Sequence, residues 1–369
     1  MGIEQGKISG WQTILLVSNS ILASMILVVP ALLSAEAGQD AWISVLIAGV
    51  MGVLIGVLVV SLGLRFPKKN LVEYSIDLLG PWFGRIVCIV FALFFLLISA
   101  YQVRSFSILL IIETIPETPL IVLNALLVVL VAYGVYLGLE VFSRVNEIVF
   151  PLFIAVFFFL FALAAPEMDL VQLKPYLTNT FPDIVWGGVI LTAFYAEGAF
   201  LLMIIPSLRS PEDAKKLVLT VAAILLVVMF IDVVGLIALF GAPETSRMMF
   251  PTFELAKTVS LGTTFLERIE SLVVGIWVGS VSLKIMSFYY VSVMIFAEVC
   301  NLREYRPLVM PYGITLVVLS LIGWHDTNHL RLDLSRYFPF VAFTVVVGTV
   351  LLLYIAVAVR RKGRQGGKT

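Results

Sequence analysis

The sequence predicts an all-α integral membrane protein with ten transmembrane helices, organised as two inverted five-helix repeats with discontinuous first and sixth helices. Three observations lead to this fold class. The chain is 61% hydrophobic and 13% charged with a mean hydropathy of +1.08, whereas soluble domains carry about 45–50% apolar and about 25% charged residues. Apolar runs recur from end to end, and small residues followed by a proline interrupt two of these runs at matching places.

A single integral membrane domain over residues 1–369 is expected, because no Gly/Ser-rich linker and no long polar block divides the chain. The net charge is zero, which gives no indication of nucleic acid binding. Cys88 lies inside an apolar run and Cys300 at a predicted helix end, so no disulfide framework is expected. The first apolar run is full length and lacks a cleavage-site pattern, so we expect it to remain as a helix.

Each crossing of the bilayer requires about 20 apolar residues at about 1.5 Å rise per residue. The first half contains five such ranges, residues 11–33, 42–64, 86–111, 120–139 and 145–165. The second half contains residues 184–205, 218–240, 271–297, 308–322 and 338–359, of which the fourth range is short. The two repeats would therefore extend over residues 11–165 and 184–359, followed by a basic tail over residues 360–369.

The distribution of Lys and Arg predicts the orientation, because cytoplasmic loops are enriched in these residues. Alternating the connecting segments places 16 of the basic residues on the side of the two termini and 6 on the other side. Acidic residues such as Glu36, Asp40 and Glu117 fall on the opposite side from the termini. The pattern predicts that both termini are cytoplasmic. The basic tail is explained as a topology anchor, with a lipid-binding patch as the alternative.

Two spans contain matching interruptions. In the first, Ser18-Asn19-Ser20 and then Ala23-Ser24-Met25-Ile26 precede Pro30, and in the sixth, Tyr195-Ala196-Glu197-Gly198-Ala199 precedes Pro206. A broken helix is tolerated in lipid only where it lines a cavity in the protein, and paired breaks are typical of inverted-repeat transporters with a site at the midplane. The alternative is close packing, since small residues also let membrane helices approach one another.

Four ionisable residues lie inside the predicted spans, namely Arg104, Glu197, Asp232 and Lys284. Such residues are costly in the bilayer and usually face the protein interior and a partner. Glu197 falls in the proposed interruption, where it could pair with Lys284 or with Arg104. Unpaired, it would be a candidate proton site. The alternative is that these residues only hold the bundle together.

The segment over residues 241–267 contains a predicted short helix at 250–256, which would lie over the outer face as a lid or as a plain surface helix. The chain has no phosphate-binding glycine loop, nucleophile elbow or metal-type Cys/His cluster. We therefore expect neither an enzyme nor a bound metal or cofactor. His325, Asp326 and His329 lie close together in an outer loop, where a solvated surface explains them better than a metal site.

These stretches resemble a known family. The run from Ala23 to Pro30 is similar to the first-helix signature of the amino acid, polyamine and organocation transporter superfamily, which has the LeuT-like fold. The signature usually has glycines where this chain has Ala23 and Met25, so the pocket would be narrower here. Further landmarks, in the same order, resemble the spore permeases that form the B subunit of nutrient germinant receptors; they are Tyr101-Gln102-Val103-Arg104, Leu173-Lys174-Pro175, residues 194–206, Phe250-Pro251-Thr252 and residues 265–271.

The resemblance implies a germinant receptor subunit that binds a small nutrient, expected to be an amino acid, between the centres of the first and sixth spans. The expected ligand-binding residues are Ala23, Ser24, Met25, Ile26, Tyr101, Tyr195, Ala196, Glu197, Gly198, Ser280 and Lys284. The chain would act in the spore inner membrane with a receptor A subunit and a lipoprotein C subunit. In a related hypothesis, Lys284 fills the place that a sodium ion takes in related transporters.

Two other functions stay open. The chain could be a secondary transporter that moves amino acids with protons, with Glu197 or Lys284 as the titrating group. It could also be a water or ion conduit that opens during germination.

Overall fold

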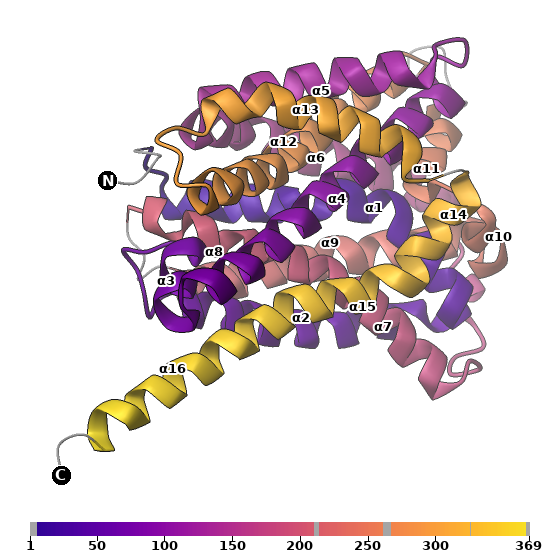
Figure 1. Cartoon of the computed structure of the whole chain (residues 1–369). Coiled ribbons are helices and arrows are strands. Elements are labelled where there is room, and N and C mark those ends of the chain that lie inside the picture. The colour runs from indigo at the N-terminus through magenta and orange to yellow at the C-terminus, as the bar shows by residue number, and fades with distance from the viewer. Residues whose placement is uncertain (1–5, 210–213, 261–266, 325, 367–369) are drawn as a thin grey trace.

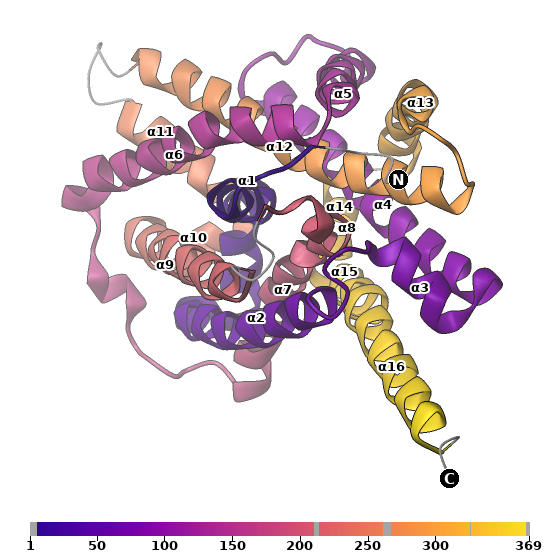
Figure 2. The ribbon, with the colours of Figure 1, turned by 90° about the vertical axis from the view of Figure 1, so that its left-hand side faces the viewer.

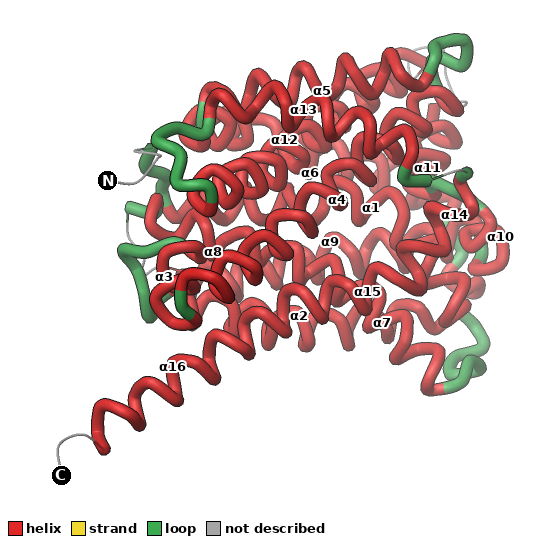
Figure 3. Tube along the Cα trace, in the orientation of Figure 1, coloured by secondary structure: helices red, strands yellow, loops and turns green. Residues whose placement is uncertain are grey.

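The computed structural model describes residues 6–209, 214–260, 267–324 and 326–366. Almost all of this part of the chain is helical, and the loops lie at the two ends of one bundle (Figure 3). Both termini lie at the same end of the bundle, which we call the terminal end, and the opposite end is called the distal end (Figure 1). Two termini at one end require an even number of crossings, as the sequence predicts.

The first half of the chain crosses five times, through α1 (Gly10–Ala37), α2 (Ala41–Gly63), α4 (Pro81–Glu113), α5 (Leu120–Leu137) and α6 (Leu139–Ala164). The second half crosses through α7 (Phe181–Ala196) with α8 (Leu201–Ile204), then α9 (Ala214–Phe240), α12 (Glu267–Val299) and α13 (Arg306–Ile322). The last crossing consists of α14 (Thr327–Leu332), α15 (Phe338–Ala342) and α16 (Gly348–Gly366). Eight described stretches have the length and hydropathy to span a membrane, and the first of them contains both α1 and α2. The 17-residue α13 is the short ninth span expected from the sequence.

Corresponding helices of the two halves pack against each other. Helix α1 contacts α7, α2 contacts α9, α4 contacts α12, and α5 contacts α13. Because each half has an odd number of crossings, the second half starts from the opposite face and is inverted relative to the first. Helix α1 also contacts α9, α12 and α6, and lies at the centre of the bundle when the molecule is viewed along its length (Figure 2). One continuous set of buried apolar side chains fills the space between the helices.

Helices α3 and α10 and the π-helical turns of the last crossing were not predicted from the sequence. Helix α3 (Leu71–Leu79) follows α2 at the terminal end and begins with a capping box between Asn70 and Glu73. Two π-helical turns, Asp333–Tyr337 and Phe343–Val347, divide the last crossing into its three helices. At the distal end, α10 (Ala242–Arg247) and α11 (Pro251–Ser260) follow α9, and α11 confirms the short helix expected there.

The prediction that the first span is interrupted is wrong. Helix α1 is α-helical without a break from Gly10 to Ala37, with Pro30 inside it. The physical reason is the local composition, because Ala23 and Met25 occupy the positions where the resembling family has glycines. Alanine and methionine are strong helix formers, whereas glycine costs about 1 kcal/mol in a helix interior. The stretch therefore stays helical.

The segment that precedes α1 closes the terminal end. The backbone N–H of Ile8 donates to the carbonyl of Ser207 at 3.0 Å, and the backbone N–H of Arg209 donates to the carbonyl of Ile8 at 3.0 Å. The Lys7 ammonium donates to the carbonyl of Pro206 at 2.7 Å. This pairing ties the start of the first span to the end of the sixth span.

At the distal end, a carboxylate between α1 and α2 organises the loop before α7. Asp40 accepts backbone N–H groups from Leu177 at 2.7 Å, Thr178 at 2.9 Å and Asn179 at 3.1 Å. A further connection is the ion pair between Arg336 and Glu36, with 3.1 Å between nitrogen and oxygen.

Candidate functional site

The expected interruption of the sixth span is present. Helix α7 ends at Ala196 and a 3₁₀ turn follows over Glu197–Phe200 before α8 begins. The backbone N–H of Glu197 donates to the carbonyl of Phe194, three residues back, which tightens the helix at this point. Gly198 lies inside the turn, where its low helix propensity favours the interruption. The turn directs the Glu197 side chain toward α12.

A buried polar cluster joins this turn to α1, α4 and α12. The Lys284 ammonium donates to Glu197 Oε2 at 2.8 Å and to Ser24 Oγ at 2.6 Å. Gln102 Nε2 also donates to Ser24 Oγ, at 3.1 Å. Lys284 is fully buried, Glu197 is 1% exposed and Ser24 is 5% exposed. The opposite charges compensate each other away from water, as a buried ion pair requires.

A second pair of side chains fixes α1 to α12 one turn away. Asn19 Nδ2 donates to the backbone carbonyl of Ser280 at 3.0 Å, and the Ser280 hydroxyl donates to Asn19 Oδ1. Both residues are fully buried. The two contacts satisfy most of the hydrogen-bonding groups of both side chains, so this pair holds the helices in register.

A cavity of about 150 Å³ adjoins the polar cluster. It lies between α4 and the last crossing. Glu197 and Gln102 line it beside the cluster, and Asp333, whose carboxylate accepts the indole N–H of Trp324, lines it from the last crossing. The other lining residues are mostly apolar; they include Phe94, Ile98, Tyr101, Trp324, Phe338 and Val341. The rings of Tyr101 and Trp324 meet edge to face with 5.4 Å between their centroids. An apolar cavity of this size can admit a molecule about as large as benzene.

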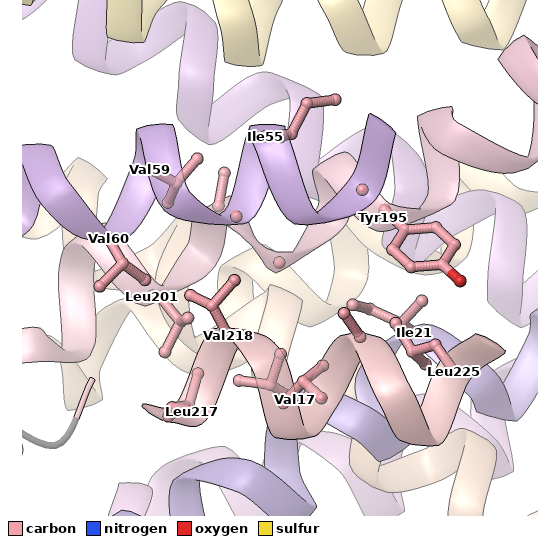
Figure 4. A pocket seen from close by; sticks show the side chains of 16 residues that line it. Val17, Ile21, Ile55, Val59, Val60, Tyr195, Leu201, Leu217, Val218 and Leu225 are labelled. Atoms are coloured by element: carbon pink, nitrogen blue, oxygen red, sulfur yellow. The ribbon is translucent and has the colours of Figure 1, made fainter. Parts of the chain in front are cut away.

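Tyr195 and Gly198 lie on a different side of the interruption from Glu197. They line a smaller cavity of about 40 Å³ between α1, α2, α8 and α9 (Figure 4). The Tyr195 ring lies beside Ile21 and Leu225 in this view. Its buried hydroxyl has no hydrogen-bond partner among the described residues.

A third cavity, of about 180 Å³, lies toward the distal end. Tyr101 lines it together with Arg247 and Arg331 from the distal segments, as well as residues of α1. The Arg331 guanidinium is directed to the backbone carbonyl of Ser246. Tyr101 therefore lies between the distal cavity and the one beside Glu197.

The structure separates the predicted site residues into groups. Ser24, Glu197 and Lys284 meet in the polar cluster, and Tyr101 lies at the adjoining cavity. Seven predicted residues are buried and line none of the three cavities; they are Ala23, Ser24, Met25, Ile26, Ala196, Ser280 and Lys284. Ser280 is the partner of Asn19. The predicted set is therefore distributed over both sides of the interruption.

The other buried charges have separate surroundings. Arg104 does not pair with Glu197; its guanidinium is 3.5 Å from the carbonyl oxygens of both Ser320 and Leu321 at the end of α13. Asp232 is fully buried and contacts the hydroxyl of Thr252 on α11.

Sequence reasoning missed Gln102 as a member of the cluster and Asn19 as the partner of Ser280. Both are polar residues inside predicted spans, and this was an available signal.

The described residues contain no group of three or more His, Cys, Asp or Glu side chains placed to hold a metal ion. Asp326 accepts the backbone N–H of His329 at 2.7 Å and thereby caps α14. His325 lies outside the described residues, as do residues 265 and 266 of the predicted landmark at 265–271.

The chain has relatives of known family. The family model described as spore germination protein matches residues 7–326. Spore germination protein KB of Bacillus subtilis (strain 168) is 26% identical over 99% of this chain and 98% of the relative. Spore germination protein YndE of the same organism is 23% identical over 97% of this chain and 98% of the relative.

Solved transporters have the same fold. MhsT in complex with L-phenylalanine aligns with a TM-score of 0.70 and 16% identity over 96% of this chain and 89% of MhsT. MHP1, a nucleobase-cation-symport-1 family transporter with bromovinylhydantoin bound, aligns with a TM-score of 0.69 and 11% identity over 98% of this chain and 94% of MHP1. These likenesses confirm the LeuT-like transporter fold. The chain belongs to the spore germination protein family of membrane permeases.

Proposed function

We propose that this chain is the nutrient-sensing membrane subunit of a spore germinant receptor and that it binds a small amino acid beside Glu197. The observation that carries this proposal is a buried, charge-compensated cluster beside a mostly apolar cavity of about 150 Å³. An amino acid combines a charged end with a side chain that is often apolar. That combination matches a cavity with polar groups at one side.

Glu197 and the interruption beside it would receive the charged end of the ligand. The carboxylate of Glu197 suits an ammonium group, and the Lys284 ammonium beside it suits a carboxylate. Phe94, Ile98 and Trp324 would contact the ligand side chain. The bound L-phenylalanine of MhsT supports an amino acid as the ligand class, since that transporter shares this fold.

Lys284 would hold α1 and α12 together where related transporters use a sodium ion. Its contacts with Ser24 on α1 and with Glu197 support this role, because a fixed ammonium already supplies a positive charge between the helices. Ligand binding should then be independent of sodium. A sodium-dependent binding signal would contradict the role proposed for Lys284.

The receptor would lie in the spore inner membrane with both termini in the cytoplasm. The excess of Lys and Arg at the terminal end supports this orientation. Its partners would be a receptor A subunit and a lipoprotein C subunit, as the family resemblance implies. The germination proteins to which this chain is similar over nearly their whole length support this assignment.

The binding proposal is tested by thermal shift measurements on the purified chain with each of the twenty amino acids. At least one amino acid should raise the melting temperature, since a ligand of the folded state stabilises it. Ile98→Phe fills the cavity beside Glu197 and should abolish the shift. The matched control is Leu93→Phe on the same helix, because Leu93 is 48% exposed on the surface of the bundle. An unchanged shift in Ile98→Phe would remove this cavity from the proposal.

Sensing is separated from transport by reconstitution in liposomes. A pure sensor should bind amino acid without accumulating it inside the vesicles under a pH gradient. Accumulation of labelled amino acid would instead identify a proton-coupled transporter. Ion flux or swelling without solute accumulation would identify a conduit.

A further inference from the structure

Pro30 leaves one carbonyl in the centre of α1 without its helical partner. Proline has no backbone N–H, so the carbonyl of the residue four positions earlier, Ile26, loses its donor. Ile26 is fully buried, where an unsatisfied carbonyl is costly. The hydroxyl of Thr252, on α11, lies 2.7 Å from the Ile26 oxygen and supplies the missing donor. A helix at the distal end thereby satisfies the backbone of the central helix.

The Thr252 hydroxyl has a second neighbour, the carboxyl group of Asp232 on α9. Asp232 Oδ1 lies 3.0 Å from Thr252 Oγ1. A hydroxyl has one proton to donate and can accept further hydrogen bonds. Because the carbonyl of Ile26 can only accept, it takes the Thr252 proton. The hydrogen bond to Asp232 then requires a proton on the carboxyl group.

The surroundings of Asp232 also favour its neutral form. The side chain is fully buried, and Oδ2 has no hydrogen-bond partner in the described structure. An ionised carboxylate in such a place would be unpaired in a medium of low dielectric constant.

The helices around Asp232 provide no counter-ion in the described structure. Helix α2 and the 3₁₀ turn Leu170–Leu173 contain no charged residue. The charged side chains on the distal parts of α1, α10 and α11 form ion pairs with other groups; these pairs are Glu36–Arg336 at 3.1 Å, Glu244–Arg247 at 3.9 Å and Glu254–Lys257 at 3.2 Å.

We propose that Asp232 is a proton-binding site, separate from the Glu197–Lys284 pair, and that its proton fastens α11 to the centre of α1. The hydrogen-bonded series from Asp232 through Thr252 to the Ile26 carbonyl connects α9, α11 and α1. Loss of the proton places an unpaired negative charge beside Thr252, which must then turn its hydroxyl from Ile26 to the carboxylate. Deprotonation therefore releases α11 from α1. The ligand of this site is a proton.

The presence of the proton is tested by infrared spectroscopy of the full-length purified chain. The difference spectrum between wild type and Asp232→Asn at neutral pH should contain the carbonyl stretch of a protonated carboxylic acid. Asparagine can donate from its amide to Thr252 as the protonated acid does, so this variant should fold. A difference spectrum with only carboxylate bands would overturn the proposal.

The fastening of α11 is tested by hydrogen exchange of the amides in Pro251–Ser260. After correction for the intrinsic pH dependence of exchange, protection in wild type should fall about tenfold on going from mildly acidic to alkaline buffer, which corresponds to one lost hydrogen bond. Asp232→Asn should stay protected at both pH values, and Thr252→Val should be poorly protected at both. The same pH dependence in Asp232→Asn as in wild type would overturn the proposal. So would protection restored by sodium ions at alkaline pH, because it would identify a cation site.

Discussion

The ion pair between Glu197 and Lys284 should stabilise the fold only as an intact pair. At the 2.8 Å separation of Lys284 Nζ and Glu197 Oε2, Coulomb's law with an effective dielectric constant of about 20 gives an attraction of about 6 kcal/mol. Much of this attraction offsets the cost of removing both charges from water. Breaking a buried pair typically costs about 3–5 kcal/mol, because one charge remains uncompensated. Lys284→Met and Glu197→Gln should therefore each destabilise the chain strongly.

The double variant provides the decisive comparison. Glu197→Gln combined with Lys284→Met removes both charges, so its free energy of unfolding should lie closer to wild type than that of either single variant. Melting of the four proteins in detergent, followed by tryptophan fluorescence, measures the coupling. The control is Glu140→Gln, which breaks an exposed pair with Arg144 at 2.6 Å and should change stability by less than about 1 kcal/mol. Additive losses in the double variant would refute the reasoning.

Three further predictions concern packing and hydrogen bonds. Gly52→Ala should lower the melting temperature by overpacking, since the added Cβ would lie 2.2 Å from a tyrosine ring. The control Gly275→Ala meets no atom within 4 Å and should leave the melting temperature unchanged. Equal melting temperatures of the two variants would contradict this prediction. Asp40→Ala should speed limited proteolysis of the loop at 177–179, because it removes the carboxylate that accepts the backbone N–H groups of this loop. An unchanged cleavage rate would count against a role of Asp40 in holding the loop. Ser280→Ala should cost about 1–3 kcal/mol in thermal unfolding because its partner on α1 keeps a buried oxygen without that donor; a neutral effect would argue against the hydrogen bond.

The sequence was sufficient to predict the crossings and part of the site. Hydropathy located the ten spans because each must satisfy its backbone within an apolar stretch. The interruption at Glu197 was predictable because a charged residue and a glycine are adjacent there and Pro206 follows. The pairing of Glu197 with Lys284 was one of two alternatives, and the structure places Arg104 elsewhere, near the end of α13. Which of two buried cations meets a carboxylate depends on helix rotation, which hydropathy does not determine.

Two parts of the site required the structure. The break expected in the first span rested on small and hydroxyl-bearing residues ahead of Pro30, but Ala23 and Met25 are strong helix formers and the helix continues through them. The cavity beside Glu197 depends on side chains of the last crossing, such as Trp324 and Phe338, which are distant in sequence. A signal for the contact of Thr252 was present, since Pro30 always deprives the carbonyl four residues earlier of its donor.

The unbroken α1 has a mechanical consequence. Its 28 residues form a rod about 42 Å long, with no flexible break to absorb displacement between its ends. Ser24 lies near the middle of this rod, and Ile8 lies just before its start, paired with Ser207. A displacement of α1 along its axis at the polar cluster would therefore also displace the backbone hydrogen bond between Ile8 and Ser207. A transporter with a broken first helix lacks this continuous helical connection between its midplane and its terminal end.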